Sequence, residues 1–297
     1  MTAMPPVTQA TEMARAKINL ALHVTGRRDD GYHLLDSLVT FCDTGDKLAI
    51  AAAEKDTFSV SGRFAASLGE PGDNLVLKAR DGLRRHLEAI GVKTGPVAIH
   101  LEKNLPVASG IGGGSADAAA TMRGLMRVWK AAPETLANDS AILLSLGADV
   151  PMCFAGKPLS ARGIGEDITL LPQMPVMALV LGNPLIGVST PGIFKLLTKR
   201  DNPPVGALPT SASLGDWIDC LKSLRNDLEP PATTLVPEIA TLRHMLDDQG
   251  ALMSRMSGSG ATCFGIFESF EQAKAAAAAL STERPDWYFC ATTTVSG

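Results

Sequence analysis

A cluster of glycines in the first half of the chain is the feature that most constrains its fold. Four glycines fall within residues 110–114, between a predicted strand at 97–101 and a predicted helix from Ser115 to about Trp129. Glycine adopts positive φ readily and lets a ligand approach the backbone amides. The unpaired N–H groups and the dipole of a helix N-terminus favour an anion. The segment therefore indicates a phosphate-binding loop, with a plain mobile connection as the alternative.

Neither of the two common nucleotide-binding fingerprints fits this loop. A Walker loop ends in Gly-Lys-Ser/Thr, and the chain contains no such tripeptide. The dinucleotide motif needs a glycine three positions after Gly112, where this chain has Ser115. If this segment binds phosphate, it belongs to a class of loop other than the Walker loop and the dinucleotide motif.

Composition and charge exclude several classes of function. The chain has 297 residues, 45% of them hydrophobic and 20% charged, with a net charge of −4. This is ordinary globular usage, and the length suggests two domains at ~150 residues each. No dense basic stripe is present to bind a nucleic acid polymer. Residues 1–14 lack the apolar run of a signal peptide. No apolar run approaches the ~18 residues needed to span a membrane. The five cysteines lack Cys-x-x-Cys spacing, which argues against a disulfide framework and a zinc site. We expect a soluble cytoplasmic protein without a membrane partner.

Hydrophobic periodicity predicts an α+β mixture in both halves of the chain. Strict strand–helix alternation is missing, which argues against a doubly wound sheet. Residues 1–13 are expected to form a flexible N-terminal lead-in, and residues 203–209 a proline-rich loop. Strands are expected at 17–24, 34–41, 48–52, 97–101, 176–181, on both sides of 258–260 and at 287–293, and helices at 74–90, 115–129, 140–146, 214–224, 238–248 and 272–280.

Three further segments could carry chemistry, although each also has a structural explanation. Lys17 and Asn19 lie on the polar face of an alternating strand, and alternation alone predicts a solvated sheet face. Asp149 follows a predicted helix in Gly147-Ala-Asp149-Val-Pro151, where an acidic residue is ordinarily a turn former. Residues 257–262 form a small-residue loop between predicted strands, which by itself is a weak signal.

Taken in order, these segments resemble the three signature motifs of the GHMP small-molecule kinases. They are Ala16-Lys17-Ile18-Asn19-Leu20, Pro106-x3-Gly110-Ile-Gly-Gly-Gly-Ser115 and Ser257-Gly-Ser-Gly-Ala261. The runs Gly26-Arg-Arg-x-Asp30-Gly-Tyr-His33, Leu146-Gly-Ala-Asp149-Val-Pro151 and Asn226-Asp-Leu-Glu229 resemble members that act on a cytidine-bearing alcohol. The resemblance spans residues 14 to 295 or so. Arg15 replaces the family's usual proline, and Ala108 and Ser109 replace two usual glycines.

The resemblance implies a two-domain α+β GHMP kinase fold. It implies a ribosomal-protein-like ATP-binding domain at residues 1–160 and a ferredoxin-like domain at 161–297, with the last strand able to return to the first domain and the active site in the cleft between them. The expected reaction is ATP-dependent phosphorylation of the 2-hydroxyl of a cytidylylated methylerythritol, in the non-mevalonate route to isoprenoid precursors, with Mg²⁺ present. The alternatives are a homoserine or mevalonate type of kinase, or a non-catalytic nucleotide-binding module.

The resemblance also assigns roles to individual residues. Lys17 and Asp149 match the catalytic pair and are expected within a few ångströms of each other, with Asp149 accepting the proton of the alcohol. Acceptor and cytidine binding are expected from Asn19, Tyr32, His33, Thr190 and Phe194, with Tyr32 and Phe194 stacking on the base and His33 bonding to its edge. ATP binding is expected from Asn74, Lys103, Pro106, Val107, Ala108, Ser109, Gly110, Ile111, Gly112, Gly113, Gly114, Ser115 and Ala116. Ser115 is the one residue expected to reach Mg²⁺.

Overall fold

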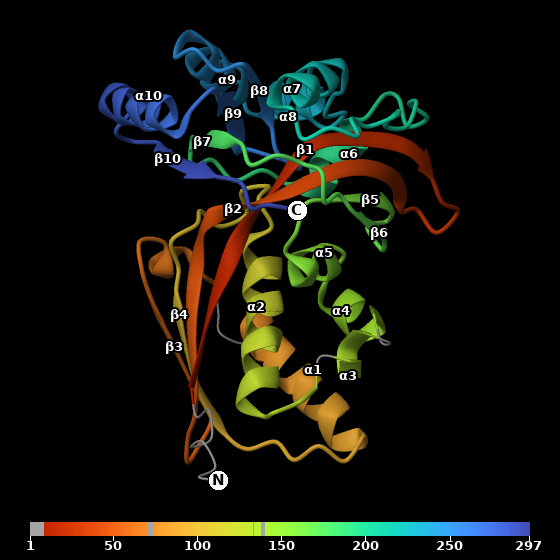
Figure 1. The fold of residues 1–297 in the computed structure, drawn as a ribbon, viewed down its shortest axis with the longest axis vertical. Helices are drawn as coiled ribbons and strands as arrows, with labels where there is room; N and C mark the ends of the chain where they lie inside the picture. The colour runs from red at the N-terminus through yellow and green to blue at the C-terminus, as the bar shows by residue number, and fades with distance from the viewer. Residues whose placement is uncertain (1–8, 70–73, 133, 138–139) are drawn as a thin grey trace. The chain divides into compact units, whose positions relative to one another are not determined.

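The computed structural model describes residues 9–69, 74–132, 134–137 and 140–297 (Figure 1). Its strands are β1 (Gln9–Arg27), β2 (His33–Ala52), β3 (Thr57–Ser61), β4 (Val97–Glu102), β5 (Leu159–Gly163), β6 (Asp167–Leu170), β7 (Ala178–Asn183), β8 (Met253–Met256), β9 (Cys263–Phe267) and β10 (Tyr288–Thr293). Its helices are the 3-10 turn η1 (Ala65–Ser67), α1 (Leu75–Ala89), α2 (Gly113–Val128), α3 (Glu134–Ala137), α4 (Ser140–Leu146), α5 (Val150–Ala155), α6 (Thr190–Leu196), α7 (Leu214–Ser223), α8 (Glu229–Leu235), α9 (Glu238–Asp248) and α10 (Phe270–Glu283).

Backbone contacts divide the chain into two compact units, and neither unit is one continuous segment. Unit 1 contains the described residues within 1–15, 45–107 and 113–155, and unit 2 contains 16–44, 108–112 and 156–297. The long strands β1 and β2 therefore begin in one unit and end in the other. The glycine-rich segment is divided in the same way, between Gly112 and Gly113.

Unit 1 packs helices against a short sheet. The second half of β2 pairs antiparallel with β4, and β3 lies parallel to β4 on its other side. Helix α2 packs against α1 and α5 (Figure 1). A Cβ atom on Gly124 of α2 would lie 2.7 Å from Ile50 Cδ1 on β2, so the helix meets the sheet where it has no side chain.

Helix α1 follows the predicted pattern closely. The Asn74 side chain accepts a hydrogen bond from Val76 N–H at 2.9 Å, which caps the first turn. Val76, Leu83 and Leu87 are buried on one stripe of the helix. The helix ends just before Gly91, as the sequence predicts.

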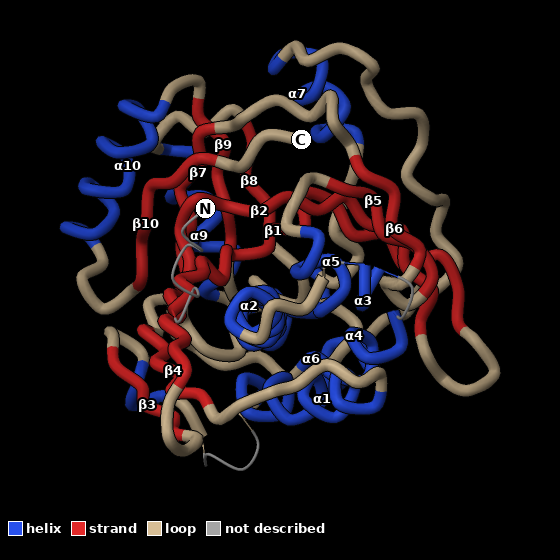
Figure 2. Tube along the Cα trace, turned by 60° about the horizontal axis from the view of Figure 1, so that its bottom comes forward, coloured by secondary structure: helices blue, strands red, loops and turns tan. Residues whose placement is uncertain are grey.

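Unit 2 contains a four-stranded antiparallel sheet in the order β10-β7-β9-β8. Figure 2 shows β10, β7 and β9 side by side. With α9 and α10, the elements follow the β-α-β-β-α-β pattern of a ferredoxin-like unit. Leu242 of α9, Leu280 of α10 and Phe267 of β9 share one buried cluster, so both helices cover the same face of the sheet. The predicted ferredoxin-like C-terminal fold is confirmed.

The prediction of two separate strands at 34–41 and 48–52 is wrong, because β2 runs without a break from His33 to Ala52. The sequence between them, Asp43-Thr-Gly45-Asp46, has the composition of a turn. Gly45 instead allows a close approach of β1, since a Cβ there would lie 2.3 Å from the carbonyl oxygen of Ala14. The Asp46 carboxylate accepts backbone N–H bonds from Asn104 and Leu105.

Two other expectations need correction. Residues 9–13 of the expected lead-in belong to β1, where Arg123 Nη2 donates to the carbonyl of Met13 at 3.2 Å; residues 1–8 lie outside the described part. The expected strand at 176–181 begins two residues later, at Ala178, and Val176 is 53% exposed. The short elements β3, β5, β6, α5, α6 and α8 were not predicted, because each is too brief to show a period.

Candidate active site

The glycine-rich segment connects β4 to the N-terminus of α2, as predicted. Ala108, Gly110 and Gly112 adopt φ values of +51°, +77° and +65°. This left-handed backbone suits glycine, whereas Ala108 pays a steric penalty there. Gly114 is exposed at the start of α2 and Ser115 is half-buried. The first amides of α2 thus stand at an accessible helix N-terminus, which is a favourable place for an anion.

The small-residue loop at 257–262 packs directly on the turn at 108–112. A Cβ on Gly110 would lie 2.5 Å from the Ser257 carbonyl oxygen, and a Cβ on Gly258 would lie 2.6 Å from the Gly110 carbonyl oxygen. Ser257 Oγ donates to that same Gly110 oxygen at 3.1 Å. Thr262 N–H donates to the Ser109 carbonyl at 3.2 Å. The second and third predicted motifs therefore meet backbone to backbone.

The first motif borders the same turn. Lys17 N–H donates to the Ile111 carbonyl at 2.9 Å, and a Cβ on Gly112 would lie 3.3 Å from Lys17 Cβ. Asn19 N–H donates to Ser257 Oγ at 3.0 Å, while its side-chain amide donates to Ser37 Oγ at 2.7 Å. Unit 2 thus brings Lys17, Asn19 and both loops together.

The prediction of a solvated polar face on this strand is wrong. Lys17 and Asn19 are each 4% exposed, and Ala21 and His23 are buried beside them. Both faces of β1 are covered here, which a period of two cannot reveal. Asn19 Oδ1 is buried and has no hydrogen-bond partner among the described residues. A buried acceptor of this kind suits a ligand that donates a hydrogen bond.

Asp149 stands at the start of α5, where its backbone carbonyl accepts from Cys153 N–H at 3.0 Å. Its side chain is half-buried. Gly147, two residues earlier, has φ +146° and lies beside the glycine-rich segment, since a Cβ on it would be 3.9 Å from Ser115 Oγ. The turn predicted from the sequence is present, and it brings the Asp149 segment close to Ser115 within unit 1.

A buried ionic cluster lies beneath the start of α2. Lys103 Nζ contacts Asp46 Oδ2 at 2.5 Å and Asp117 Oδ2 at 2.6 Å, and the side chains of all three residues are at most 4% exposed. A Cβ on Gly113 would lie 3.3 Å from Lys103 Nζ. The side chain of Lys103, one of the residues expected to bind ATP, is therefore already engaged by two carboxylates, and that of Asn74 caps α1.

The charges of this cluster do not balance. Burial raises the pKa of Asp117 to about 7, because the Asp46 carboxylate adds to the effect and Lys103 offsets it only in part. Burial by itself would lower the pKa of Lys103, but Asp117 and Asp46 raise it. Asp46 and Asp117 are not among the site residues expected from the sequence. An acidic residue inside the apolar Ala-rich stretch of α2 was the available signal.

The residues expected to bind cytidine form a small aromatic group in unit 2. The rings of His33 and Phe194 stack with centroids 4.5 Å apart and planes 22° apart. Tyr32 is 61% exposed, and its backbone N–H donates to Asp30 Oδ1 at 3.2 Å. Thr190 Oγ1 lies 2.7 Å from Ser259 Oγ of the small-residue loop. No base fits between His33 and Phe194 at this spacing, so a stacked base would use an outer ring face.

The His33 imidazole can form a hydrogen bond to the polar edge of a base. Its Nε2 is buried without a hydrogen-bond partner among the described residues. Burial lowers the pKa of His33, and the charges of Arg200 and Arg27 lower it further. The imidazole is therefore neutral near pH 7, with one nitrogen able to donate and the other able to accept.

The residues that the structure describes contain neither a metal-ion site nor a membrane-spanning helix. Within the described residues, no group of three His, Cys, Asp or Glu side chains is arranged to hold a metal ion. No helix in the same ranges is both long and apolar enough to cross a membrane. One hollow of about 440 Å³ in unit 1 contains none of the expected site residues; it is lined by Thr11, Glu12, Met13, Lys47, Leu48, Ala49, His100 and Glu102.

Comparison with known proteins places the chain in a family. Residues 74–157 match the family model described as GHMP kinases N terminal domain, and residues 207–286 match GHMP kinases C terminal. The chain is 60% identical over 289 residues to the 4-diphosphocytidyl-2-C-methyl-D-erythritol kinase of Rhizobium etli (strain CIAT 652), covering 97% of this chain and 95% of the relative. It is 57% identical to the enzyme of the same name from Agrobacterium fabrum, covering 97% of each chain.

The chain belongs to the 4-diphosphocytidyl-2-C-methyl-D-erythritol kinases, within the GHMP kinases.

Solved structures agree with this membership of the kinase family. A crystal structure of 4-(cytidine 5'-diphospho)-2C-methyl-D-erythritol kinase matches with a TM-score of 0.78 and 32% identity, covering 97% of this chain and all of the other. A homoserine kinase from Cytophaga hutchinsonii matches with a TM-score of 0.69 at 17% identity, covering 100% of this chain and 96% of the other, and shows the shared fold alone. The predicted GHMP kinase fold and the predicted class of small-molecule kinase are confirmed.

Proposed function

We propose that this chain transfers the γ-phosphoryl group of ATP to the 2-hydroxyl of 4-diphosphocytidyl-2-C-methyl-D-erythritol, giving the 2-phosphate and ADP. The observation that carries the proposal is the backbone packing of the 108–112 turn on the 257–262 loop beside Lys17 and Asn19. Relatives at about 60% identity that carry this name support it. The reaction supplies isoprenoid precursors and would take place in the cytoplasm, without a nucleic acid or membrane partner.

The phosphates of ATP are proposed to lie on the backbone amides of residues 110–116. Phosphoryl transfer asks the protein mainly for positioning and charge stabilisation. Backbone N–H groups at a helix N-terminus supply both without adding side-chain bulk. The positive φ at Gly110 and Gly112 turns the chain sharply there. The four glycines at 110 and 112–114 have no Cβ, so that phosphate oxygens can approach their amides.

Asp149 is proposed to accept the proton of the alcohol. As the alcohol oxygen bonds to the γ-phosphorus, the bond from that phosphorus to the β–γ bridging oxygen breaks and ADP leaves with the electron pair. Lys17 is proposed to offset charge on the transferring group. Within unit 2, Lys17 borders Gly112, and within unit 1 the turn that precedes Asp149 borders Ser115.

The residues present are compatible with Mg²⁺, which kinases commonly use. Mg²⁺ keeps several water ligands and binds substrate phosphates, so it needs few protein ligands. The half-buried Ser115 hydroxyl, at the start of α2, is the group proposed to reach it. When bound, the ion would neutralise charge on the phosphate oxygens.

The cytidine is proposed to bind at Tyr32, His33, Thr190 and Phe194. The unpartnered His33 Nε2 offers a polar contact to the base edge. Tyr32 and the outer ring faces of the His33–Phe194 pair offer stacking surfaces. A site that pairs polar groups rejects ligands lacking them far better than an apolar slot does.

A coupled ADP-release assay tests the proposed function. The purified chain is mixed with ATP and Mg²⁺, and ADP is followed after addition of the cytidylyl alcohol. We expect ADP release that depends on this alcohol and that homoserine and mevalonate do not support. Equal turnover with homoserine or mevalonate would assign another acceptor, and ATP binding without turnover would favour a non-catalytic module.

A further inference from the structure

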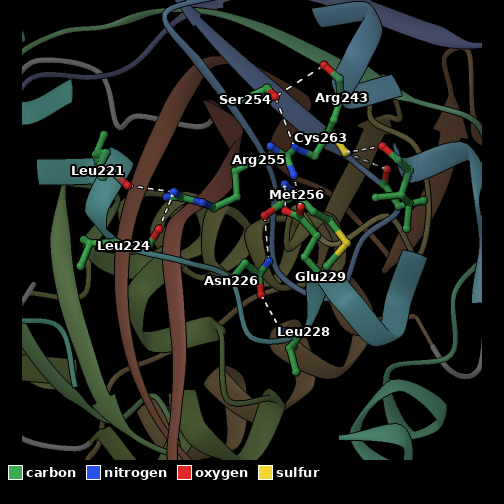
Figure 3. A network of polar contacts seen from close by, with 12 residues as sticks. Leu221, Leu224, Asn226, Leu228, Glu229, Arg243, Ser254, Arg255, Met256 and Cys263 are labelled. Carbon is green, nitrogen blue, oxygen red and sulfur yellow. Dashed lines mark hydrogen bonds and ion pairs between the residues drawn. The ribbon is translucent and has the colours of Figure 1, made fainter. Parts of the chain in front are cut away.

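Residues 226–229 lie outside the three signature motifs, and they form hydrogen bonds to Met256 and Gly258 at the start of the small-residue loop. Figure 3 shows Asn226 and Glu229 directed at Met256, the residue that precedes the small-residue loop. The Asn226 side-chain amide donates to the carbonyl oxygens of Met256 and Gly258, both at 2.8 Å. Glu229 Oε2 accepts from Met256 N–H at 2.9 Å. Three backbone groups of this turn are thereby fixed by two side chains.

The Asn226 side chain is itself rigidly placed. It is 4% exposed, and its Oδ1 accepts from Leu228 N–H at 3.0 Å. The backbone on either side is bound to β1, since Leu22 N–H donates to the Arg225 carbonyl at 2.9 Å and Asp227 N–H donates to the Leu22 carbonyl at 2.8 Å. The segment is anchored to the strand that carries Lys17 and Asn19.

Glu229 is oriented from its other oxygen. Arg243 Nη1 contacts Glu229 Oε1, and Arg243 Nε donates to Ser254 Oγ at 3.3 Å (Figure 3). The ion pair holds the carboxylate so that Oε2 faces the Met256 amide. A charged acceptor makes a stronger bond to a backbone N–H than a neutral one.

Ser257 connects the Met256–Gly258 turn to the candidate active site by two hydrogen bonds. Its Oγ accepts from Asn19 N–H at 3.0 Å and donates to the Gly110 carbonyl at 3.1 Å. Gly110 and Gly258 pack without space for a Cβ on either. A displacement of the 257–258 turn would therefore move both Asn19 and the 108–112 turn, which is proposed to bind phosphate.

We propose that Asn226 and Glu229 are positioning residues for the kinase reaction: they set the Met256–Gly258 turn, which fixes the 108–112 turn and Asn19 for ATP and the acceptor. This inference rests on the proposed function. Neither residue would touch a reacting atom, so both act through Ser257 and the backbone around it.

The test uses Asn226→Asp and Glu229→Gln. Asn226→Asp keeps the shape of the side chain but turns an acceptor toward two carbonyl oxygens. Glu229→Gln keeps an oxygen near Met256 N–H but removes the charge. We expect kcat to fall and KM for ATP to rise in Asn226→Asp, each by on the order of tenfold, with smaller changes in Glu229→Gln. Each variant is assayed at a temperature where circular dichroism shows it folded.

A matched control separates positioning from general destabilisation. Leu280→Ala empties a buried position on α10, a helix that packs on β7, β9 and β10; it should lower Tm while leaving KM for ATP unchanged. A double-mutant cycle with Ser257→Ala adds a second readout, because residues acting through one group are not additive. We expect Asn226→Asp to add little to the loss already caused by Ser257→Ala.

Two results would overturn the inference: a folded Asn226→Asp enzyme with wild-type kcat and KM for ATP, or effects that add fully to those of Ser257→Ala. If Asn226→Asp does not fold, Glu229→Gln decides by the same criteria. The wild-type chain is assayed first, and an inactive wild type would count against the proposed function rather than against this inference. The Kd of a fluorescent ATP analogue would then test the inference. Weaker binding is expected in both variants, and unchanged binding would overturn the inference.

Discussion

His33 and Phe194, which are far apart in the chain, stack on each other with ring centroids 4.5 Å apart. An aromatic pair in this arrangement contributes about 0.5–1.5 kcal/mol beyond its buried area. The stacking orients the imidazole, whose Nε2 is buried and has no hydrogen-bond partner among the described residues. Phe194 therefore has a role even where it does not touch a base directly.

Phe194→Ala should raise KM for the cytidylyl alcohol by about tenfold, because the His33 ring loses its support and the base loses a stacking surface. Tyr32→Ala should raise the same constant to a similar degree. Steady-state kinetics with each substrate varied in turn provides the measurement. KM for ATP serves as the internal control and should stay within about twofold. An unchanged KM for the alcohol in Tyr32→Ala would exclude stacking by Tyr32.

Asp149→Ala and Lys17→Ala should each lower kcat by on the order of 10² or more, since one removes the proposed proton acceptor and the other the neighbouring cation. Stopped assays of ADP formation measure the loss. Thermal unfolding must show that both variants remain folded. Near-normal turnover in a folded Asp149→Ala enzyme would show that Asp149 is not the base.

His23 should make stability depend on pH. Burial lowers the pKa of His23, the charge of Arg225 lowers it further, and Nδ1 and Nε2 bond to Pro203 O and Arg225 N–H. Since the folded pKa lies below the unfolded 6.5, the unfolded chain binds more protons between the two values. The contribution of His23 to the free energy of unfolding should be greatest above pH 6.5 and should decline as the pH drops below it.

Urea titrations between pH 5 and 8 measure this effect. His23→Gln should show a weaker fall in the free energy of unfolding over the acidic half of that range. The same slope in His23→Gln and in the wild type would assign the pH dependence to other groups.

The two carboxylates of the buried cluster should respond differently to mutation. The folded pKa of Asp117 is raised above 3.8 to about 7, so its ionisation costs stability as the pH rises through that window. Asp117→Asn should therefore match or exceed the wild-type Tm at pH 8. Asp46→Ala removes one of the two carboxylates that contact Lys103 and leaves the N–H groups of Asn104 and Leu105 without this acceptor. It should cost about 3 kcal/mol or more.

Differential scanning calorimetry at pH 5 and pH 8 distinguishes these cases. The advantage of Asp117→Asn over the wild type should grow with pH. A large loss of Tm in Asp117→Asn at pH 8 would mean that the Asp117 charge stabilises the fold.

Ala108→Gly should relieve backbone strain at the turn. Ala108 has φ +51°, a conformation that costs an L-residue about 1–2 kcal/mol, against about 0.5–1 kcal/mol lost to the greater freedom of glycine in the unfolded chain. The net gain should be about 0–1.5 kcal/mol. Ala278→Gly, on the exposed side of α10, is the control and should cost about 1 kcal/mol. A loss in Ala108→Gly equal to that of the control would argue against strain.

Local features could be predicted from the sequence and long-range ones could not. The limits of α9 and the cap at Asn74 match the predictions, because the signals lie within a few residues. The glycine-rich segment was recognisable for the same reason. The burial of Asn19 depends on partners such as Ser257, which lies 238 residues away. A periodic pattern contains no information on such coverage.

The candidate site shows the same division. The resemblance to a kinase family supplied roles for Lys17, Asn19 and His33 that alternation and turn statistics would have assigned to structure. It did not supply the Lys103 cluster, whose members Asp46 and Lys103 are 57 residues apart. Nor did it suggest a function for Asn226, because the role of that residue depends on a turn formed much later in the chain.

The interleaving of the two compact units has a consequence for genetics. Unit 1 takes its residues from three stretches of the chain and unit 2 fills the intervals, so no single cut releases either of them whole. A crossover within residues 16–155 that joined this gene to that of a distant relative would place foreign sequence in both units at once. Such hybrids should rarely survive, and new specificities should arise by replacing individual loops.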